Sequence, residues 1–388
     1  MRAPLRLVAT CVLGLEEILE GELSALGVAE VEREKGAVAF SGSWQDCWRA
    51  NWRLRTANRV LVELGSWEGR DGGELAAGAR ALISRRLPGR KDRAAAGIDP
   101  TALLHPDRSF SIQATCTASQ IRDSRWAALS VKDGIVDGQR DHWGRRASID
   151  RADPEVHLRL RLHRDRATLL LDTSGEPLDR RGYRAVTSGA PLREQLAAAC
   201  VLASGWDGSG PVVDPMCGSG TLLVEAAWIA LGRAPGCLRE GWAFERLPGF
   251  DQGAFAAIRA EPLPAPGPGV HLWGNDRSPE ALRAARENLA CAGLLSRATL
   301  SRGDAAQIQL PEEPGLVVVN PPHGERLGAD AAAWRAVGDL LKQRFKGWRA
   351  VVLAGGEDRG KHIGLRPRRR MPVMNGPLEA RILLFDLF

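Results

Sequence analysis

The chain has 388 residues, of which 44% are hydrophobic and 26% are charged, and this is an ordinary globular composition. It excludes a disordered, collagen-like or coiled-coil protein, and no apolar run approaches the roughly 18 residues that a membrane-spanning helix needs. Lysine and arginine outnumber aspartate and glutamate by 53 to 47, so the net charge of +6 favours an anionic partner such as nucleic acid.

The cysteines and histidines give no sign of a metal site or a disulfide framework. The seven cysteines include no C-x-x-C pair, and the seven histidines include no H-E-x-x-H motif. We therefore expect no metal and no membrane association, and the scattered thiols fit a protein of the reducing cytoplasm. The length predicts two or three domains.

The first part of the chain has an α+β pattern. Its predicted elements are a strand over 7–13, a helix over 16–26, a strand over 36–41, a helix over 44–58 and a strand over 59–64. A basic run over 80–93 follows, and it fits a solvated helix face as well as an RNA contact.

The next stretch contains a strand over 110–116 and a helix over 124–139. Residues 156–171 alternate between apolar and basic, which predicts two antiparallel strands that turn at 163–166. Residues 173–190, with Pro177 and Gly182, are interpreted as a linker.

Beyond Pro191 strands and helices alternate. The expected strands are 211–214, 270–276, 298–303, 316–320 and 348–354, and the expected helices are 191–204, 221–231, 279–292 and 331–344. Apolar strands separated by helices predict a parallel sheet with both faces covered. An insertion over 232–269 ends in a proline- and glycine-rich spacer, and the segment after the Asn375-Gly376 turn is expected to close the sheet antiparallel.

The first chemical motif runs from Asp214 to Thr221, between an apolar strand and a helix. Its glycines let the backbone approach a ligand, and the helix start offers free N–H groups. Leu223 replaces the last glycine of a dinucleotide fingerprint and no lysine follows Gly220, so S-adenosylmethionine suits this turn better than a pyrophosphate. A purely structural turn is the alternative. The residues assigned here to the cofactor are Asp214, Cys217, Gly218, Ser219, Gly220 and Thr221.

Two further acids, Asp276 and Asp304, follow the next two strands. Each alone is as well explained as a helix cap. Because ligands of open α/β sheets lie past the carboxyl ends of the strands, however, acids at three consecutive strand ends outline one pocket.

The second motif, Asn320-Pro321-Pro322-His323, ends the fourth strand of this sheet. The prolines remove backbone donors, which leaves carbonyl oxygens and the Asn320 side-chain oxygen as acceptors for an exocyclic amine. His323 is flat and is expected to stack on an extracted base. These four residues are the predicted catalytic set, and Asn320 also borders the cofactor pocket.

Together the two motifs resemble the class I methyltransferase domain of bacterial guanine-N2 RNA methyltransferases, in particular the 23S ribosomal RNA enzymes that carry a THUMP domain. The likeness also includes segments 14–17, 131–137, 171–176, 181–184 and 375–378. The resemblance implies a ferredoxin-like subdomain over 1–65, a THUMP domain over 66–172, and a Rossmann-like methyltransferase domain over 191–388. The sheet of that last domain would have seven mostly parallel strands with the last one antiparallel.

The resemblance also implies an activity, namely methyl transfer from S-adenosylmethionine to the N2 amine of a guanosine in 23S ribosomal RNA. Asp214, Gly218 and Gly220 would line the methionine end, Asp276 the ribose and Asp304 the adenine, while Asn320 and the Pro321 carbonyl would hold the target amine. The alternatives are a tRNA guanine-N2 enzyme, an adenine-N6 enzyme, and a non-catalytic ribosome-assembly factor. The last is raised by His323, where the family usually has tyrosine or phenylalanine.

Structured RNA is the expected partner, ribosomal RNA before tRNA, and the sequence does not indicate an oligomeric state. Basic residues that bind phosphates would make this binding salt-dependent. A cluster over 366–370 is expected near the rim of the active site. The candidate RNA-binding residues are Arg85, Arg86, Arg122, Lys132, Arg368 and Arg369.

Overall fold

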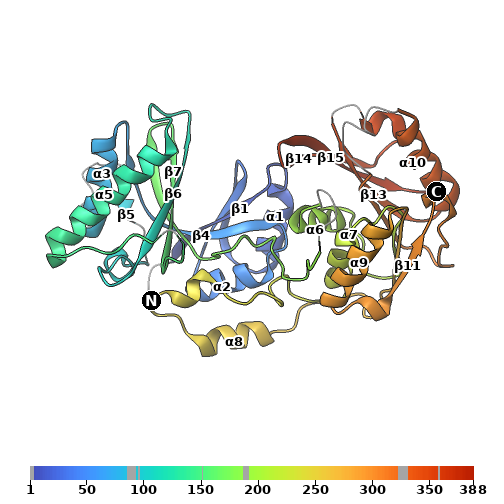
Figure 1. Ribbon diagram of the computed structural model, residues 1–388, viewed down its shortest axis with the longest axis horizontal. Helices are drawn as coiled ribbons and strands as arrows, with labels where there is room; N and C mark the ends of the chain where they lie inside the picture. The colour runs from blue at the N-terminus through green and yellow to red at the C-terminus, as the bar shows by residue number, and fades with distance from the viewer. Residues whose placement is uncertain are drawn as a thin grey trace.

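The computed structural model describes residues 4–84, 93–94, 97–150, 152–186, 192–321, 331–356 and 359–388. Its strands form two sheets, one in the N-terminal half of the chain and one in the C-terminal half (Figure 1). Within these residues, no helix combines the length and the apolar character needed to cross a bilayer.

The N-terminal sheet has the strand order β2-β3-β1-β4-β8-β7-β6, with β5 on the side of β4. Its strands are β1 Leu5–Cys11, β2 Ala29–Glu34, β3 Ala37–Gly42, β4 Ala57–Glu68, β5 Arg93–Ala94, β6 Phe110–Thr117, β7 Val156–His163 and β8 Arg166–Asp172. Its helices are α1 Glu16–Ala25, α2 Trp44–Arg53, α3 Gly72–Ser84, α4 Pro100–Leu103 and α5 Ser124–Trp143. The expected β7–β8 hairpin is confirmed.

The twelve-residue strand β4 joins two units into one sheet, because it pairs with β1 along one edge and with β8 along the other. The boundary expected after residue 65 falls inside this strand. The N-terminal half therefore has one continuous sheet, and the α3–α5 pair packs at one end of it (Figure 1).

Helix α2 is shorter than expected, ending at Arg53 and not at residue 58. The reason is a contact between distant parts of the chain. The backbone N–H groups of Arg55 and Thr56 donate to the carboxylate of Glu22 at 2.7 and 3.0 Å, so they are not available to extend the helix. The chain then enters β4 at Ala57.

The C-terminal sheet has the order β11-β10-β9-β12-β13-β15-β14. Its strands are β9 Val212–Asp214, β10 Leu272–Asp276, β11 Ala298–Arg302, β12 Leu316–Val319, β13 Arg349–Gly355, β14 Arg369–Asn375 and β15 Leu378–Asp386. The main helices are α6 Glu194–Ala203, α7 Thr221–Ala230, α8 Gln252–Ala260, α9 Pro279–Cys291 and α10 Ala331–Arg344. The last strand, β15, is antiparallel to both of its neighbours, as expected.

The insertion over 232–269 is more than a spacer, because it carries α8 and packs on α2 of the N-terminal half. Trp52 of α2 meets Trp242 and Phe255 of the insertion edge to face, with ring centroids 6.5 and 6.2 Å apart. Beside these rings, Arg53 forms an ion pair of 2.6 Å with Glu261. Aromatic burial of this kind ties the two halves of the molecule together.

The linker segment is buried where it passes between the two halves. Arg181 and Tyr183 have almost no exposed surface, and both face Glu225 of α7. Arg181 Nε lies 3.5 Å from Glu225 Oε1, and the Tyr183 hydroxyl donates to the same oxygen at 3.1 Å. Burial raises the pKa of Glu225, and the nearby guanidinium groups of Arg181 and Arg55 oppose that rise. Arg181 also donates to the backbone carbonyl of Arg55.

This arrangement predicts the effect of removing one partner of the buried pair. Arg181→Met leaves Glu225 without its nearest cation, and such a loss costs about 3–5 kcal/mol. Arg180→Met removes an exposed arginine one position earlier, which pairs with Glu176 on the surface, and is expected to cost less than about 1 kcal/mol. Urea unfolding of the two variants measures the difference. Equal stabilities would contradict a structural role for the pair.

Candidate functional site

The site lies where the strand order of the C-terminal sheet reverses. Strand β9 has β10 as its neighbour on one side and β12 on the other. In the pairing of β9 with β12, Val212 lies opposite Leu316 and Val213 lies opposite Val317. Asp214 ends β9 and Asn320 follows β12, at the same edge of the sheet. With strands about 4.8 Å apart and a rise of about 3.3 Å per residue, their backbones lie within about 8 Å of each other. Such a reversal is where open α/β sheets bind ligands.

The turn after β9 is open on the side of Gly218. Gly218 and Gly220 have φ values of +52° and +81°, which favour glycine. A Cβ atom on Gly218 would meet nothing within 4 Å, whereas one on Gly220 would lie 3.4 Å from Ala285. The backbone at Gly218 therefore faces free space, and Gly220 packs against α9 at the start of α7.

Asp214 is a buried carboxyl group at the floor of this turn, only 1% exposed. Its Oδ1 accepts a hydrogen bond from the Met216 N–H at 3.0 Å. Burial, together with the negative charge of Asp276, raises the pKa of Asp214 to about 8, against the effect of that hydrogen bond. Among the described residues, no positively charged side chain lowers the pKa of Asp214, so a cationic ligand would favour its ionised form.

Asp276 links the end of β10 to the glycine turn. Its carboxylate accepts from the Gly218 N–H and from the Ser278 N–H, both at 2.9 Å. The helix that follows is capped by Ser278, whose hydroxyl accepts from the Ala281 N–H at 3.1 Å. The interpretation of Asp276 as that helix cap was therefore wrong.

Asp304 lies farther out along the same edge and is partly exposed. It caps a short 3₁₀ helix by accepting from the Ala306 N–H at 2.9 Å, and it forms an ion pair of 2.5 Å with Arg277. The Ala306 N–H and Arg277 lower the pKa of Asp304. The capping interpretation is confirmed for this residue, and its contact with an adenine stays a prediction.

Three assigned residues of the turn direct their side chains toward the protein. The Cys217 thiol is buried, and burial together with Asp214 raises its pKa well above the ordinary value, so it is not a reactive thiolate. Ser219 and Thr221 are also buried, and Arg184 donates to the Thr221 hydroxyl at 3.1 Å. These residues are thus placed to offer a ligand their backbone and not their side chains.

Two buried asparagines support the site, and sequence reasoning did not assign either a role. Asn275 of β10 donates to the carbonyls of Pro215 and Gly303 at 3.2 and 3.1 Å, which connects the ends of the flanking strands β9 and β11. Asn288 of α9 donates to the Ser219 carbonyl at 3.0 Å and accepts from the Ala185 N–H at 2.9 Å. The sequence gives little indication of the role of Asn288, because most asparagines in amphipathic helices face solvent.

The second motif is described only in part. Asn320 is partly exposed and Pro321 is buried directly after β12. Pro322 and His323 lie outside the described residues, so their predicted roles stay predictions. Among the residues that the structure describes, no three histidine, cysteine or acidic side chains are grouped to hold a metal ion.

The expected RNA-binding residues are spread over both halves. Arg85 and Arg86 lie outside the described residues, Arg122 is exposed just before α5, and Lys132 pairs with Asp133. RNA binding by these residues stays a prediction.

The arginines at the start of β14 do not lie at the rim of the site, and that expectation was wrong. Arg369 of β14 lies opposite Leu384 of β15, and Leu384 lies opposite Val351 of β13. Val351 is in the first half of β13, so Arg369 is far from the carboxyl end of that strand. Arg369 forms an ion pair of 2.6 Å with Glu17 of the N-terminal half, and Arg368 donates to the Ser204 carbonyl at 2.9 Å. Both side chains are engaged in contacts within the protein.

Family models match three consecutive parts of the chain. An RlmL ferredoxin-like domain matches residues 6–61, a THUMP domain matches 92–172, and an RMKL-like methyltransferase domain matches 181–383, which is more than half of the chain. The last match includes the glycine turn and Asn320, so it contains the site described above.

Curated relatives match along nearly the whole chain. Proteins named ribosomal RNA large subunit methyltransferase K/L, from Syntrophotalea carbinolica and Allochromatium vinosum, are each 38% identical over 100% and 96% of this chain. The chain spans about half of their length, 54% and 50%. A Synechocystis protein that carries a provisional name as an RNA methyltransferase is 35% identical, with 98% of this chain and 96% of its own length covered.

Solved structures share the complete architecture. A protein that carries a provisional name as a methyltransferase, solved in complex with SAH, superposes with a TM-score of 0.85 at 28% identity, covering 100% of this chain and 99% of the other. A Listeria monocytogenes protein described as a predicted N6-adenine-specific DNA methylase gives 0.82 at 28% identity, with 99% and 97% covered. The expected class I methyltransferase fold, preceded by a ferredoxin-like and THUMP region, is confirmed. The chain belongs to the RMKL-like methyltransferase family.

Proposed function

We propose that this chain is an S-adenosylmethionine-dependent RNA methyltransferase that modifies the N2 amine of a guanosine in 23S ribosomal RNA, in the cytoplasm. The observation that carries the proposal is the placement of Asp214 and Asn320 at one reversal of strand order. The names of the K/L relatives and the match to a THUMP domain support an RNA substrate and favour ribosomal RNA.

The residues around the glycine turn fit S-adenosylmethionine. Asp214 is a buried carboxyl group that forms no ion pair with the described residues, so it suits the ligand's ammonium group, and Gly218 faces free space. Asp276 uses one lone pair of each oxygen for backbone N–H groups, so each oxygen still has capacity to accept from a ribose hydroxyl. When bound, this cofactor supplies a methyl group activated by a sulfonium.

Asn320 and Pro321 are proposed to orient the nucleophile. The amide oxygen of Asn320 and the carbonyl of Pro321 accept the two hydrogens of an exocyclic amine, which directs the nitrogen toward the methyl group. Holding the reactants in this geometry provides much of the rate acceleration. The nitrogen releases a proton after attack, so no strong base is needed in the site.

An adenine-N6 enzyme is the second candidate, because an Asn-Pro-Pro turn suits any exocyclic amine, and the Listeria structure is described in those terms. Nucleoside mass spectrometry of ribosomal RNA from cells with and without the protein separates the two. Loss of N2-methylguanosine supports the proposal, loss of N6-methyladenosine supports the alternative, and loss of neither contradicts both.

Asn320→Ala is expected to lower the methylation rate at least about 100-fold, because the target amine loses its positioning acceptor. Binding of SAH, measured by titration calorimetry, should change little. Gln309→Ala removes an exposed amide from the same domain and serves as the matched control, with wild-type turnover expected. A fully active Asn320→Ala enzyme would rule out this role.

The raised pKa of Asp214 predicts opposite pH dependences for ligand binding and for stability. SAH affinity should rise with pH until about 8, where the carboxylate that pairs with the ammonium group is formed. The ligand-free fold should instead lose stability from about pH 4 to about pH 8, because the folded state binds the Asp214 proton more tightly than the unfolded state does. Calorimetry and urea unfolding at several pH values measure the two trends. Asp214→Asn should bind SAH more weakly, and its SAH affinity and its stability should both depend less on pH. An unchanged pH profile in that variant would contradict the proposed role of Asp214.

A further inference from the structure

Arg184 connects the linker segment to the glycine turn of the candidate site. It follows the buried Tyr183 in the part of the linker segment that lies between the two halves. Its side chain is only 15% exposed and ends at the start of α7, beside the hydroxyl groups of Ser219 and Thr221. A residue of the linker segment therefore contacts the turn directly.

All three nitrogens of the Arg184 guanidinium group are engaged. Nε donates to the Glu194 carboxylate at 2.8 Å, and one terminal nitrogen donates to the Leu192 carbonyl at 2.9 Å and to the Thr221 hydroxyl at 3.1 Å. The other terminal nitrogen donates to the Ser219 hydroxyl at 3.4 Å. Glu194 offsets the positive charge, so the turn receives hydrogen bonds from a planar group whose donors have fixed directions.

Asn288 of α9 holds the same parts of the chain together. Its amide nitrogen donates to the carbonyls of Ser219 and Val186 at 3.0 and 3.2 Å. Its amide oxygen accepts from the Ala185 and Val186 N–H groups at 2.9 and 3.2 Å. Ser219 is thus held at its hydroxyl by Arg184 and at its carbonyl by Asn288.

The turn needs such contacts because it has little stiffness of its own. Ser219 lies between Gly218 and Gly220, and glycine loses more conformational freedom on ordering than any other residue. A turn that became ordered only when the ligand binds would lower the affinity by the cost of that ordering. Hydrogen bonds to Ser219 and Thr221 order the turn before the ligand arrives.

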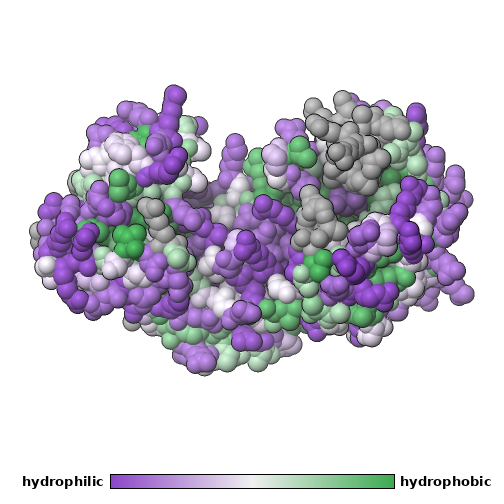
Figure 2. Space-filling model, viewed as in Figure 1, coloured by the Kyte–Doolittle hydropathy of each residue, from purple (hydrophilic) through white to green (hydrophobic). Residues whose placement is uncertain are grey.

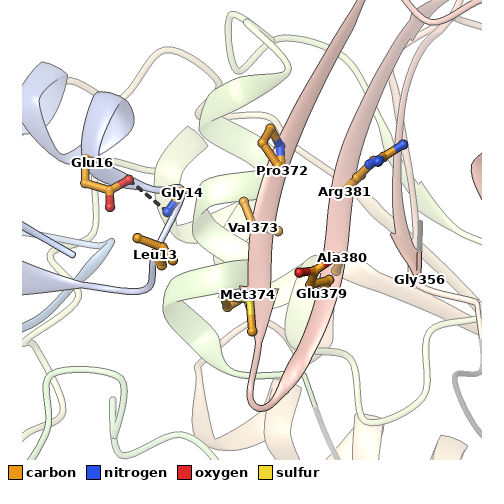
Figure 3. Close-up of a pocket in the computed structure, with 10 residues that line it drawn as sticks. All are labelled: Leu13, Gly14, Glu16, Gly356, Pro372, Val373, Met374, Glu379, Ala380 and Arg381. Atoms are coloured by element: carbon orange, nitrogen blue, oxygen red, sulfur yellow. Dashed lines mark hydrogen bonds between the residues drawn. The ribbon is translucent and has the colours of Figure 1, made fainter. Parts of the chain in front are cut away.

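A second contact between the two halves does not reach this turn. The Leu13–Gly14 loop meets the β14–β15 hairpin, where the Met374 N–H donates to the Leu13 carbonyl at 3.0 Å (Figure 3). None of the described residues that line the cavity there belongs to the glycine turn. The linker segment, in contrast, contacts the turn through Arg184.

We propose that Arg184 is a positioning residue for the cofactor, which holds the glycine turn in the conformation that binds S-adenosylmethionine. The inference rests on the proposed function, because it takes this turn as the cofactor site. Arg184 acts through Ser219 and Thr221, while its own charge stays paired with Glu194. Because the same segment carries Arg181 into the junction with the N-terminal half, cofactor affinity depends on how this segment is seated.

Arg184→Met in the full chain should raise the dissociation constant for SAH about tenfold, as expected for the loss of hydrogen bonds from a charged group. Titration calorimetry measures this constant, and the stoichiometry should stay at one SAH per chain. KM for S-adenosylmethionine should rise by the same factor, with kcat at saturating cofactor and KM for ribosomal RNA unchanged. A protein that is only destabilised would instead bind fewer equivalents of SAH with an unchanged dissociation constant.

Arg184→Lys separates positioning from stability. It keeps a cation beside Glu194, but a single ammonium group cannot replace the guanidinium bonds to the Leu192 carbonyl and to both hydroxyl groups. Its midpoint of urea unfolding should be closer to wild type than that of Arg184→Met, whereas its SAH affinity should be as weak. Arg180→Met, which changes an exposed arginine of the same segment, is the matched control and should bind SAH like wild type.

Wild-type SAH affinity in Arg184→Lys would overturn the proposal, whether or not Arg184→Met folds. Wild-type affinity in a folded Arg184→Met protein would overturn it as well. A wild-type protein that binds SAH but methylates no RNA would instead overturn the proposed function, so the two failures are distinguishable.

Discussion

The reversal of strand order between β9 and β12 is the constraint on which the rest of the site depends. Asp214 and Asn320 are more than a hundred residues apart in the chain, and the parallel pairing of their strands brings them to one edge. A parallel sheet requires long crossover connections, and here these are the helices that cover it. The geometry of the site is thus a property of the sheet.

Hydrogen bonds from buried side chains then fix the loops at this edge. Asp276 holds the Gly218 N–H, Asn275 joins two strand ends, and Asn288 connects the Ser219 carbonyl to the linker segment. The last contact extends the support beyond the catalytic domain, because the same linker segment carries Arg181 into the junction with the N-terminal half. The glycine turn and the N-terminal half are therefore connected through one buried segment. In Figure 2 the upper edge of the view is hollowed between the lobe that contains α3 and α5 and the side that contains β14 and β15.

Local patterns predicted the alternating strands and helices beyond residue 191 and the two chemical motifs, since each depends on neighbours in the chain. Contacts between distant segments were not predictable in this way. The end of α2 depends on Glu22, and β14 was hidden because its first residues, Arg369 and Arg370, look like a solvated basic cluster. Strand β2 is mostly exposed and has no apolar alternation to reveal it. The asparagine contacts depend on helix packing, which spacing along the sequence does not encode.

The shared strand β4 fixes the spacing between the two units of the N-terminal half. Side chains alternate between the two faces of a strand, so one residue added within β4 would turn every following side chain to the opposite face. Small insertions in this strand would therefore disrupt the packing of the ferredoxin-like or the THUMP unit. In a flexible linker the same insertions would only lengthen the connection between the two units. The spacing between these two units is set once, when the N-terminal sheet forms.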